Sequence, residues 1–190
     1  MCYNFAGLAL KERSDALKKP FIAVIGARNS GKSTIIKSLT GCPQASYRGF
    51  VKDRVIKKTI YVSACSPQEK TLTQQGITQE VKELQRIIQK TEKNNACLGI
   101  VMAIQPDGQR PRRERLSMKK IFETVPKKTF RTYAFVLDPG YPNQKASKSL
   151  FEEVERQLKE ANIQALSCKL DARRFAFNNA MEINCRARLL

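Results

Sequence analysis

Apolar and polar residues along the chain follow two different rhythms. Short apolar runs at residues 21–25, 97–104 and 132–137 are typical of buried strands. The run at 97–104 is uninterrupted, as expected of a parallel strand that is covered on both faces. Elsewhere apolar residues recur every three or four positions, as on one face of a helix, and the clearest set is Ile77, Val81, Leu84, Ile87 and Ile88. Strand-like and helix-like segments therefore follow one another along the chain.

Turn and capping residues give these segments approximate bounds. The pattern predicts strands at residues 21–25, 47–51, 55–64, 97–104, 132–137 and 164–170, the second and third forming a hairpin or two neighbouring strands. It predicts helices at residues 5–18, 32–39, 77–88, 116–125, 149–158 and 175–189. Pro20 is expected to end the first helix and Gly41 the second. Ser149, three residues before Glu152, forms a capping box.

The alternation of strands and helices indicates the fold class. It is typical of an α/β protein with an open, mostly parallel sheet that has helices on both faces. A chain of 190 residues fits one domain that is long enough to bury a core. We therefore predict a single domain over residues 1–190, in which residues 1–20 are a helical extension.

A loop with a specific spacing follows the first predicted strand. Its residues match the pattern G-x-x-x-x-G-K-[ST] and are Gly26, Ala27, Arg28, Asn29, Ser30, Gly31, Lys32, Ser33 and Thr34. A strand comes before the loop and a helix-forming stretch after it, which is the context that gives this motif its meaning. The sequence therefore predicts that these nine residues bind the phosphates of a nucleoside phosphate.

Each residue type in the loop has a chemical reason. Gly26 and Gly31 let the backbone turn sharply, so that successive N–H groups converge on phosphate oxygens. The following helix points its positive N-terminus at the same phosphates. Lys32 is predicted to act catalytically as a point charge on the β and γ oxygens, and Ser33 to be a ligand of Mg²⁺. Arg28 is expected to point to solvent, with a contact to a phosphate as the alternative.

Over residues 22–41 the chain resembles the P-loop NTPase superfamily, and in particular the G domains of translation-factor GTPases. The resemblance rests on the loop, on Asn29 within it and on the Leu39-Thr40-Gly41 ending of the next helix. The hairpin, the order of elements and the length also fit. The resemblance implies a three-layer P-loop NTPase fold that binds a nucleoside triphosphate with Mg²⁺ and hydrolyses it.

Two further motifs of G domains are degenerate in this chain. Residues 63–69 read Ser-Ala-Cys-Ser-Pro-Gln-Glu where that family has Asp-x-x-Gly, which contacts Mg²⁺ through water. Residues 136–141 read Val-Leu-Asp-Pro-Gly-Tyr where it has the guanine-reading Asn-Lys-x-Asp. The choice between ATP and GTP therefore stays open.

Hydrolysis requires an acidic group at a strand end beside the loop. The candidates are Asp138 and Glu69 as catalytic residues and Asp107 as a metal ligand, with Gln68 as an alternative to Glu69. Each also fits an ordinary turn, because Pro106-Asp107-Gly108 and Asp138-Pro139-Gly140 are common turn sequences.

Charge adds a second prediction. The formal net charge of +18 attracts polyanions such as free nucleotide, nucleic acid or an acidic membrane surface. The basic residues form three groups, which are Lys52, Arg54, Lys57 and Lys58; Arg110, Arg112, Arg113, Arg115, Lys119 and Lys120; and Arg173, Arg174, Arg186 and Arg188. Solvated faces are the simpler interpretation of these groups. The alternative is a lid over phosphates or a track for nucleic acid. Aromatic residues make up only 7% of the chain and are not expected to interleave with these arginines, which weakens the case for base stacking by a single strand.

Several function classes are excluded or disfavoured. The sequence has no histidine, and none of its six cysteines forms a C-x-x-C pair, which removes the usual zinc spacings and His-based acid–base catalysis. No apolar run approaches the roughly 20 residues of a membrane-spanning helix. Residues 1–19 mix charged residues among apolar ones, so a signal-peptide core is not predicted and a cytoplasmic location is expected.

Three functions remain as hypotheses. The first and preferred one is a Mg²⁺-dependent nucleoside-triphosphatase or nucleotide switch, with slow turnover that a partner stimulates. A protein partner or a homo-oligomer is expected with it. The second is a small kinase that uses the same loop and clamps its acceptor with the arginines at 110–115. The third is a basic nucleic-acid-binding module with a vestigial nucleotide site.

Overall fold

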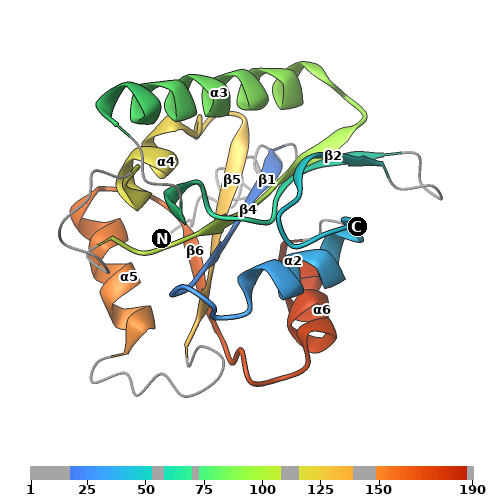
Figure 1. The fold of residues 1–190 in the computed structure, drawn as a ribbon, viewed down its shortest axis with the longest axis vertical. Coiled ribbons are helices and arrows are strands. Elements are labelled where there is room, and N and C mark those ends of the chain that lie inside the picture. The colour runs from blue at the N-terminus through green and yellow to red at the C-terminus, as the bar shows by residue number, and fades with distance from the viewer. Residues whose placement is uncertain (1–17, 53–57, 70–72, 108–115, 139–148, 188–190) are drawn as a thin grey trace, which may run out of the picture.

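Six strands form one sheet in the order β2-β3-β4-β1-β5-β6. The computed structural model describes residues 18–52, 58–69, 73–107, 116–138 and 149–187 (Figure 1). Within them the strands are β1 (Lys19–Ile25), β2 (Arg48–Lys52), β3 (Thr59–Ser63), β4 (Cys97–Ile104), β5 (Phe130–Leu137) and β6 (Leu166–Leu170). Only β2, at one edge, runs antiparallel to its neighbour, and the other pairs are parallel. The predicted mostly parallel sheet is confirmed.

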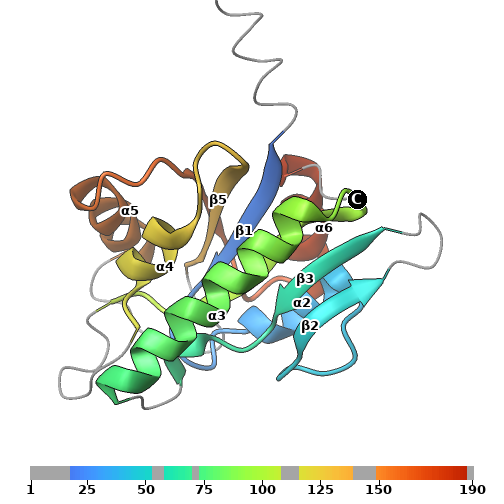
Figure 2. The same cartoon turned by 90° about the horizontal axis from the view of Figure 1, so that it is seen from above.

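Helices cover both faces of this sheet. They are α2 (Lys32–Thr40), α3 (Gln74–Lys93), α4 (Met118–Thr124), α5 (Leu150–Glu160) and α6 (Ala176–Ala187), and a short 3₁₀ turn, η1 (Pro67–Glu69), follows β3. Figures 1 and 2 show α3, α4 and α5 on one face and α2 with α6 on the other. The α/β fold with three layers is thus confirmed. The predicted helix at residues 5–18 lies outside the described residues.

Burial on both faces explains why residues 21–25 of the central strand, β1, are all apolar. Phe21, Ala23 and Ile25 pack into the core beneath α3, α4 and α5, whereas Ile22 and Val24 pack into the core beneath α2 and α6. All five side chains are completely buried. Because successive residues of a strand point to opposite faces, a strand that is covered on both faces has no position left for a polar residue.

The first strand begins two residues earlier than predicted. Lys19 and Pro20 pair with β5, so they belong to the sheet and not to a helical extension that ends at residue 20. A Cβ atom at Gly99, in the neighbouring strand β4, would lie 2.3 Å from the Pro20 carbonyl oxygen. Glycine at position 99 therefore gives the backbone of β1 room beside β4.

Capping residues fix the helix ends that border the sheet. Gly41 ends α2 in the left-handed conformation, with φ of 65°, and its N–H donates to the Lys37 carbonyl, as predicted. The Ser149 side chain caps α5 by accepting from the Glu152 N–H, also as predicted. Thr73 and Ser117 cap α3 and α4 in the same way. In the part of the chain that the structure describes, no helix combines the length and the apolar character needed to cross a bilayer.

Candidate functional site

The loop between β1 and α2 turns sharply through two residues in the left-handed region. Asn29 and Gly31 adopt positive φ angles of 62° and 90°, which turn the chain sharply into α2. Gly31 is the N-cap residue and has no side chain with which to satisfy the first-turn amides of α2. The first-turn N–H groups at this end of the helix therefore suit an anionic ligand.

Lys32 folds back over this loop. Its side chain is only 4% exposed, and its Nζ donates to the carbonyl oxygens of Gly26 at 3.0 Å and Ala27 at 2.6 Å. Burial of an ammonium group costs free energy unless polar atoms surround it. The backbone of the loop supplies such atoms, and it holds a positive charge at the site where phosphates are predicted to bind.

Close contact across the loop explains the glycine at position 26. A Cβ atom there would lie 2.4 Å from the Ser30 Oγ and 3.3 Å from the Leu137 Cβ. Ser30 is 1% exposed, and its hydroxyl has no hydrogen-bond partner among the described residues. Most buried hydroxyl groups are paired, so a ligand oxygen in the loop would satisfy this one. The motif alone gave Ser30 no distinct role.

Ser33 links the loop to the end of β3. Its Oγ donates to the Ala64 carbonyl oxygen at 2.7 Å. Both are hard oxygen atoms of the kind that Mg²⁺ accepts as ligands, so the donors fit the predicted ion. Among the described residues there is no group of three or more His, Cys, Asp or Glu side chains that could hold a metal. Mg²⁺ commonly uses only one or two protein ligands together with phosphate oxygens, so it does not require such a group.

The position of β1 in the sheet places this loop at a topological switch point. The helix after β1, α2, covers one face, whereas α4 and α5, after the neighbouring strands β4 and β5, cover the other (Figure 1). In open α/β sheets ligands bind outside the carboxyl ends of the strands at such a point. We call this the carboxyl edge of the sheet.

Two of the predicted acids flank the loop at the carboxyl edge. Ile25 is level with Ile104 of β4 and with Val136 of β5. Asp107 therefore follows the strand on one side of β1, and Asp138 follows the strand on the other. Glu69 ends η1, after β3, which is one strand further from the loop, and its side chain lies outside the described part of the chain.

Asp138 is held by groups from α5 and β6. Its Oδ2 accepts from the Ser149 hydroxyl at 2.7 Å and the Phe151 N–H at 3.2 Å, and it lies 3.4 Å from the Lys169 Nζ. Burial by itself raises the pKa of this carboxyl group, but these three contacts outweigh burial and lower the pKa below its usual value. Asp138 is therefore an anion at neutral pH.

This lowered pKa predicts a specific dependence of stability on pH. The unfolded chain binds the proton of Asp138 more readily than the folded chain, so the residue stabilises the fold above about pH 4 and loses this effect as pH falls through its folded pKa. We expect the wild-type chain to melt higher than Asp138→Asn above about pH 5, and this gap to close below pH 4. Melting curves of both proteins from pH 7 to pH 3 measure it. A gap of constant size down to pH 3 would contradict the prediction.

Asp107 has a structural role at the start of α4. Its Oδ1 accepts from the Met118 N–H at 2.7 Å and its Oδ2 from the Lys119 N–H at 3.4 Å. Both oxygens thus bind first-turn amides of a helix, which favour a negative charge. This agrees with the simpler interpretation of Asp107 as a turn residue, and its role as a metal ligand stays a prediction.

Gln68 joins the ends of β3 and β4 through its amide group. Its Nε2 donates to the Gln105 carbonyl at 2.8 Å, while its Oε1 accepts from the Gln105 N–H at 2.6 Å. The side chain is buried. No local pattern in the sequence predicts this pair, because it depends on β3 and β4 being neighbours. The pair fixes η1 beside the carboxyl edge.

The remaining predicted residues are exposed or lie outside the description. Arg28 and Thr34 are exposed, and Ala27 is buried. In the basic groups, Lys52, Lys58, Lys119 and Lys120 are exposed. The arginines at 110–115 lie outside the described residues, so the structure does not place them beside the loop.

Comparison with known proteins gives little beyond the geometry. No protein-family model matches the chain. No curated protein matches it. A solved structure titled "Crystal structure of APE1195" is similar with a TM-score of 0.45 and 15% identity, over 90% of this chain and 96% of that chain. This similarity is too weak to carry a functional inference, so the site is interpreted from its own residues.

Proposed function

We propose that the chain binds a nucleoside triphosphate with Mg²⁺ at residues 26–34 and works as a nucleotide switch or slow nucleoside-triphosphatase. The observation that supports this most is the buried Lys32 ammonium, held by carbonyls of a loop that joins the central strand to a helix N-terminus. A positive charge in that position suits a polyanion that inserts between the loop and α2.

The residues of the loop would share the work of binding. Backbone N–H groups at the start of α2 would donate to the phosphate oxygens, and Lys32 would neutralise charge on the outer phosphates. Ser33 would be a ligand of Mg²⁺, and its hydrogen bond to the Ala64 carbonyl would bring the end of β3 near the same ion. When bound, Mg²⁺ supplies charge neutralisation on the β and γ oxygens.

Asp138 would contribute as an anion and not as a base. Its lowered pKa makes it a poor proton acceptor at neutral pH but a good orienting group for water around a cation. Asp138 would then stabilise a bound metal nucleotide without activating water as a base. The proposal therefore includes slow turnover, which a partner would stimulate.

A ligand panel tests the binding. We expect Mg²⁺ with ATP or GTP to raise the melting temperature, because a ligand at about 100 times its Kd stabilises by about 2.7 kcal/mol. For a domain of this size that corresponds to roughly 5–10 °C. The measurement is a thermal-shift series with ATP, GTP, ADP, GDP and inorganic phosphate, each with Mg²⁺ or with EDTA. The nucleotide with the largest shift identifies the preferred base.

Two results would oppose the proposal. Absence of any shift with all four nucleotides at millimolar concentration would show that the loop does not bind them. An equal shift with inorganic phosphate would show that the loop is only a general anion site.

A further inference from the structure

Two phenylalanines are exposed where β6 leads into α6. Phe175 is 83% exposed and Phe177 is 64% exposed, and Met181, one turn further along α6, is 47% exposed. Scattered exposed apolar residues are common, but two neighbouring phenylalanine rings with most of their surface in water are not. Neither ring contributes to the cores on the two faces of the sheet.

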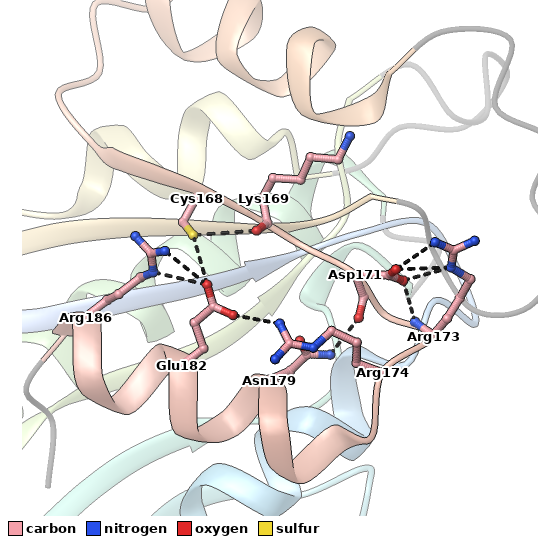
Figure 3. A network of polar contacts seen from close by, with 8 residues as sticks. All are labelled: Cys168, Lys169, Asp171, Arg173, Arg174, Asn179, Glu182 and Arg186. Carbon is pink, nitrogen blue, oxygen red and sulfur yellow. Dashed lines mark hydrogen bonds and ion pairs between the residues drawn. The ribbon is translucent and has the colours of Figure 1, made fainter.

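Arginines lie directly beside these rings. Arg173 and Arg174 immediately precede Phe175, and their side chains are 66% and 49% exposed. Figure 3 shows Arg173 paired with Asp171, while Arg174 and Arg186 both pair with Glu182. One carboxylate thus serves two guanidinium groups. Exposed ion pairs are weak, and a guanidinium carries five N–H donors, so these arginines can also donate to a phosphate.

Residues 173–177 lie at the same edge of the sheet as the loop at residues 26–34. β6 runs parallel to β5, which runs parallel to β1, so the turn after Leu170 and the loop after Ile25 both lie at the carboxyl edge. The backbone N–H of Asp138 donates to the Leu170 carbonyl, which holds the ends of β5 and β6 together. The exposed rings therefore follow directly on the carboxyl edge of the sheet.

We propose that residues 173–177 are a contact surface for single-stranded nucleic acid, with bases stacked on Phe175 and Phe177 and phosphates bound by Arg173 and Arg174. Exposed aromatic faces beside arginines are the combination that binds unpaired bases without sequence readout. A duplex hides its base faces, so it would use the arginines but not the rings. The net charge of +18 favours a polyanion as the partner of this surface over a neutral or basic protein. The expectation that aromatic residues do not interleave with the arginines is therefore wrong at residues 173–177, where two phenylalanines follow two arginines. The low aromatic content of the whole chain does not show that these two rings are exposed.

A tryptophan reporter tests stacking directly, because the chain contains no tryptophan. Phe175→Trp would carry the reporter at the proposed surface, and Phe50→Trp, on the edge strand β2 at 40% exposure, would carry it at the opposite side of the sheet. Each variant is titrated with a 12-nucleotide oligouridine RNA and with an RNA duplex of equal length, without nucleotide. We expect saturable quenching of the Phe175→Trp fluorescence by the single strand only, and no quenching of Phe50→Trp. Binding of the RNA with unchanged fluorescence at position 175 would overturn the proposal.

Affinity measurements separate stacking from charge. We expect Phe175→Ala with Phe177→Ala to weaken binding of a labelled oligouridine by about ten-fold or more in fluorescence anisotropy. Arg173→Gln with Arg174→Gln should lower the salt slope by about 0.7 for each lost phosphate contact. The matched control is Lys127→Gln with Lys128→Gln, which removes the same charge from exposed residues before β5, at the opposite edge.

The outcomes distinguish binding at residues 173–177 from attraction by the net charge of the whole protein. Equal weakening by the arginine pair and by the lysine pair would show that only net charge matters and would overturn the proposal. Undiminished binding by the phenylalanine variant would also overturn the proposal. So would the absence of saturable binding by the wild-type chain at about 50 mM salt. Because the titrations contain no nucleotide, they do not depend on the function proposed for residues 26–34.

Discussion

Lys32→Ala should remove most of the thermal stabilisation that Mg²⁺ and nucleoside triphosphate give the wild-type chain. The Lys32 Nζ lies on the Gly26 and Ala27 carbonyls, beside the proposed phosphate site, and alanine leaves no charge at that position. Hydrogen bonds to charged groups are each worth about 1.5–3 kcal/mol, so the loss of this group should weaken binding by about a hundred-fold. Isothermal titration with the preferred nucleotide measures the Kd of both proteins.

Lys37→Ala is the matched control for this experiment. Lys37 lies on the same helix, is exposed and has the same charge, so its removal should change the Kd by less than about three-fold. Melting of both variants without ligand separates loss of binding from loss of folding. A Lys32→Ala protein that binds as tightly as wild type would refute the role given to Lys32. That result would favour the third hypothesis, a module with a vestigial nucleotide site.

Phe21→Ala should have the largest effect on stability. Phe21 is completely buried in β1, the central strand, and its ring packs edge-on against Phe122 of α4 with centroids 6.0 Å apart. Truncation of a buried phenylalanine to alanine costs about 3–5 kcal/mol because a cavity remains. Since natural domains are stable by only about 5–15 kcal/mol, this is a large share of the total. Urea denaturation measures the change.

The control for this core substitution is Phe175→Ala. The side chain removed is the same, but at 83% exposure its loss should change the free energy of unfolding by no more than about 0.5 kcal/mol. A loss below about 1 kcal/mol for Phe21→Ala would mean that α3, α4 and α5 do not pack on β1 as described. The same denaturation, run on Phe175→Ala with Phe177→Ala, shows whether the variant used in the nucleic-acid experiment is folded.

Local sequence predicted most elements well because their causes are local. The uninterrupted apolar run at 97–104 coincides with β4, and Gly41 and Ser149 cap their helices as predicted. The bounds failed where pairing between distant segments decides them. Lys19 and Pro20 join the sheet only because β5 lies beside them, and no neighbour in the sequence signals this.

Parts of the candidate site could not be predicted, because they depend on the order of the strands. The insertion of β4 between β3 and β1 makes Gln68 a partner of Gln105. The placement of β5 on the other side of β1 brings Asp138 to the loop. Both placements join segments that lie far apart in the sequence, and an apolar run has the same pattern whichever strand becomes its neighbour.

The sequence by itself determined the shape of the loop at residues 26–34, the apolar character of the central strands and the alternation of strands with helices. These features follow from the backbone preferences of glycine and from the spacing of apolar residues in strands and helices. Both causes act over only a few residues. The tertiary structure decided which strand ends surround the loop, that Lys32 is buried on the Gly26 and Ala27 carbonyls, and that Phe175 and Phe177 are left in water. These depend on which surfaces can be packed together at the same time, and that is a property of the whole chain.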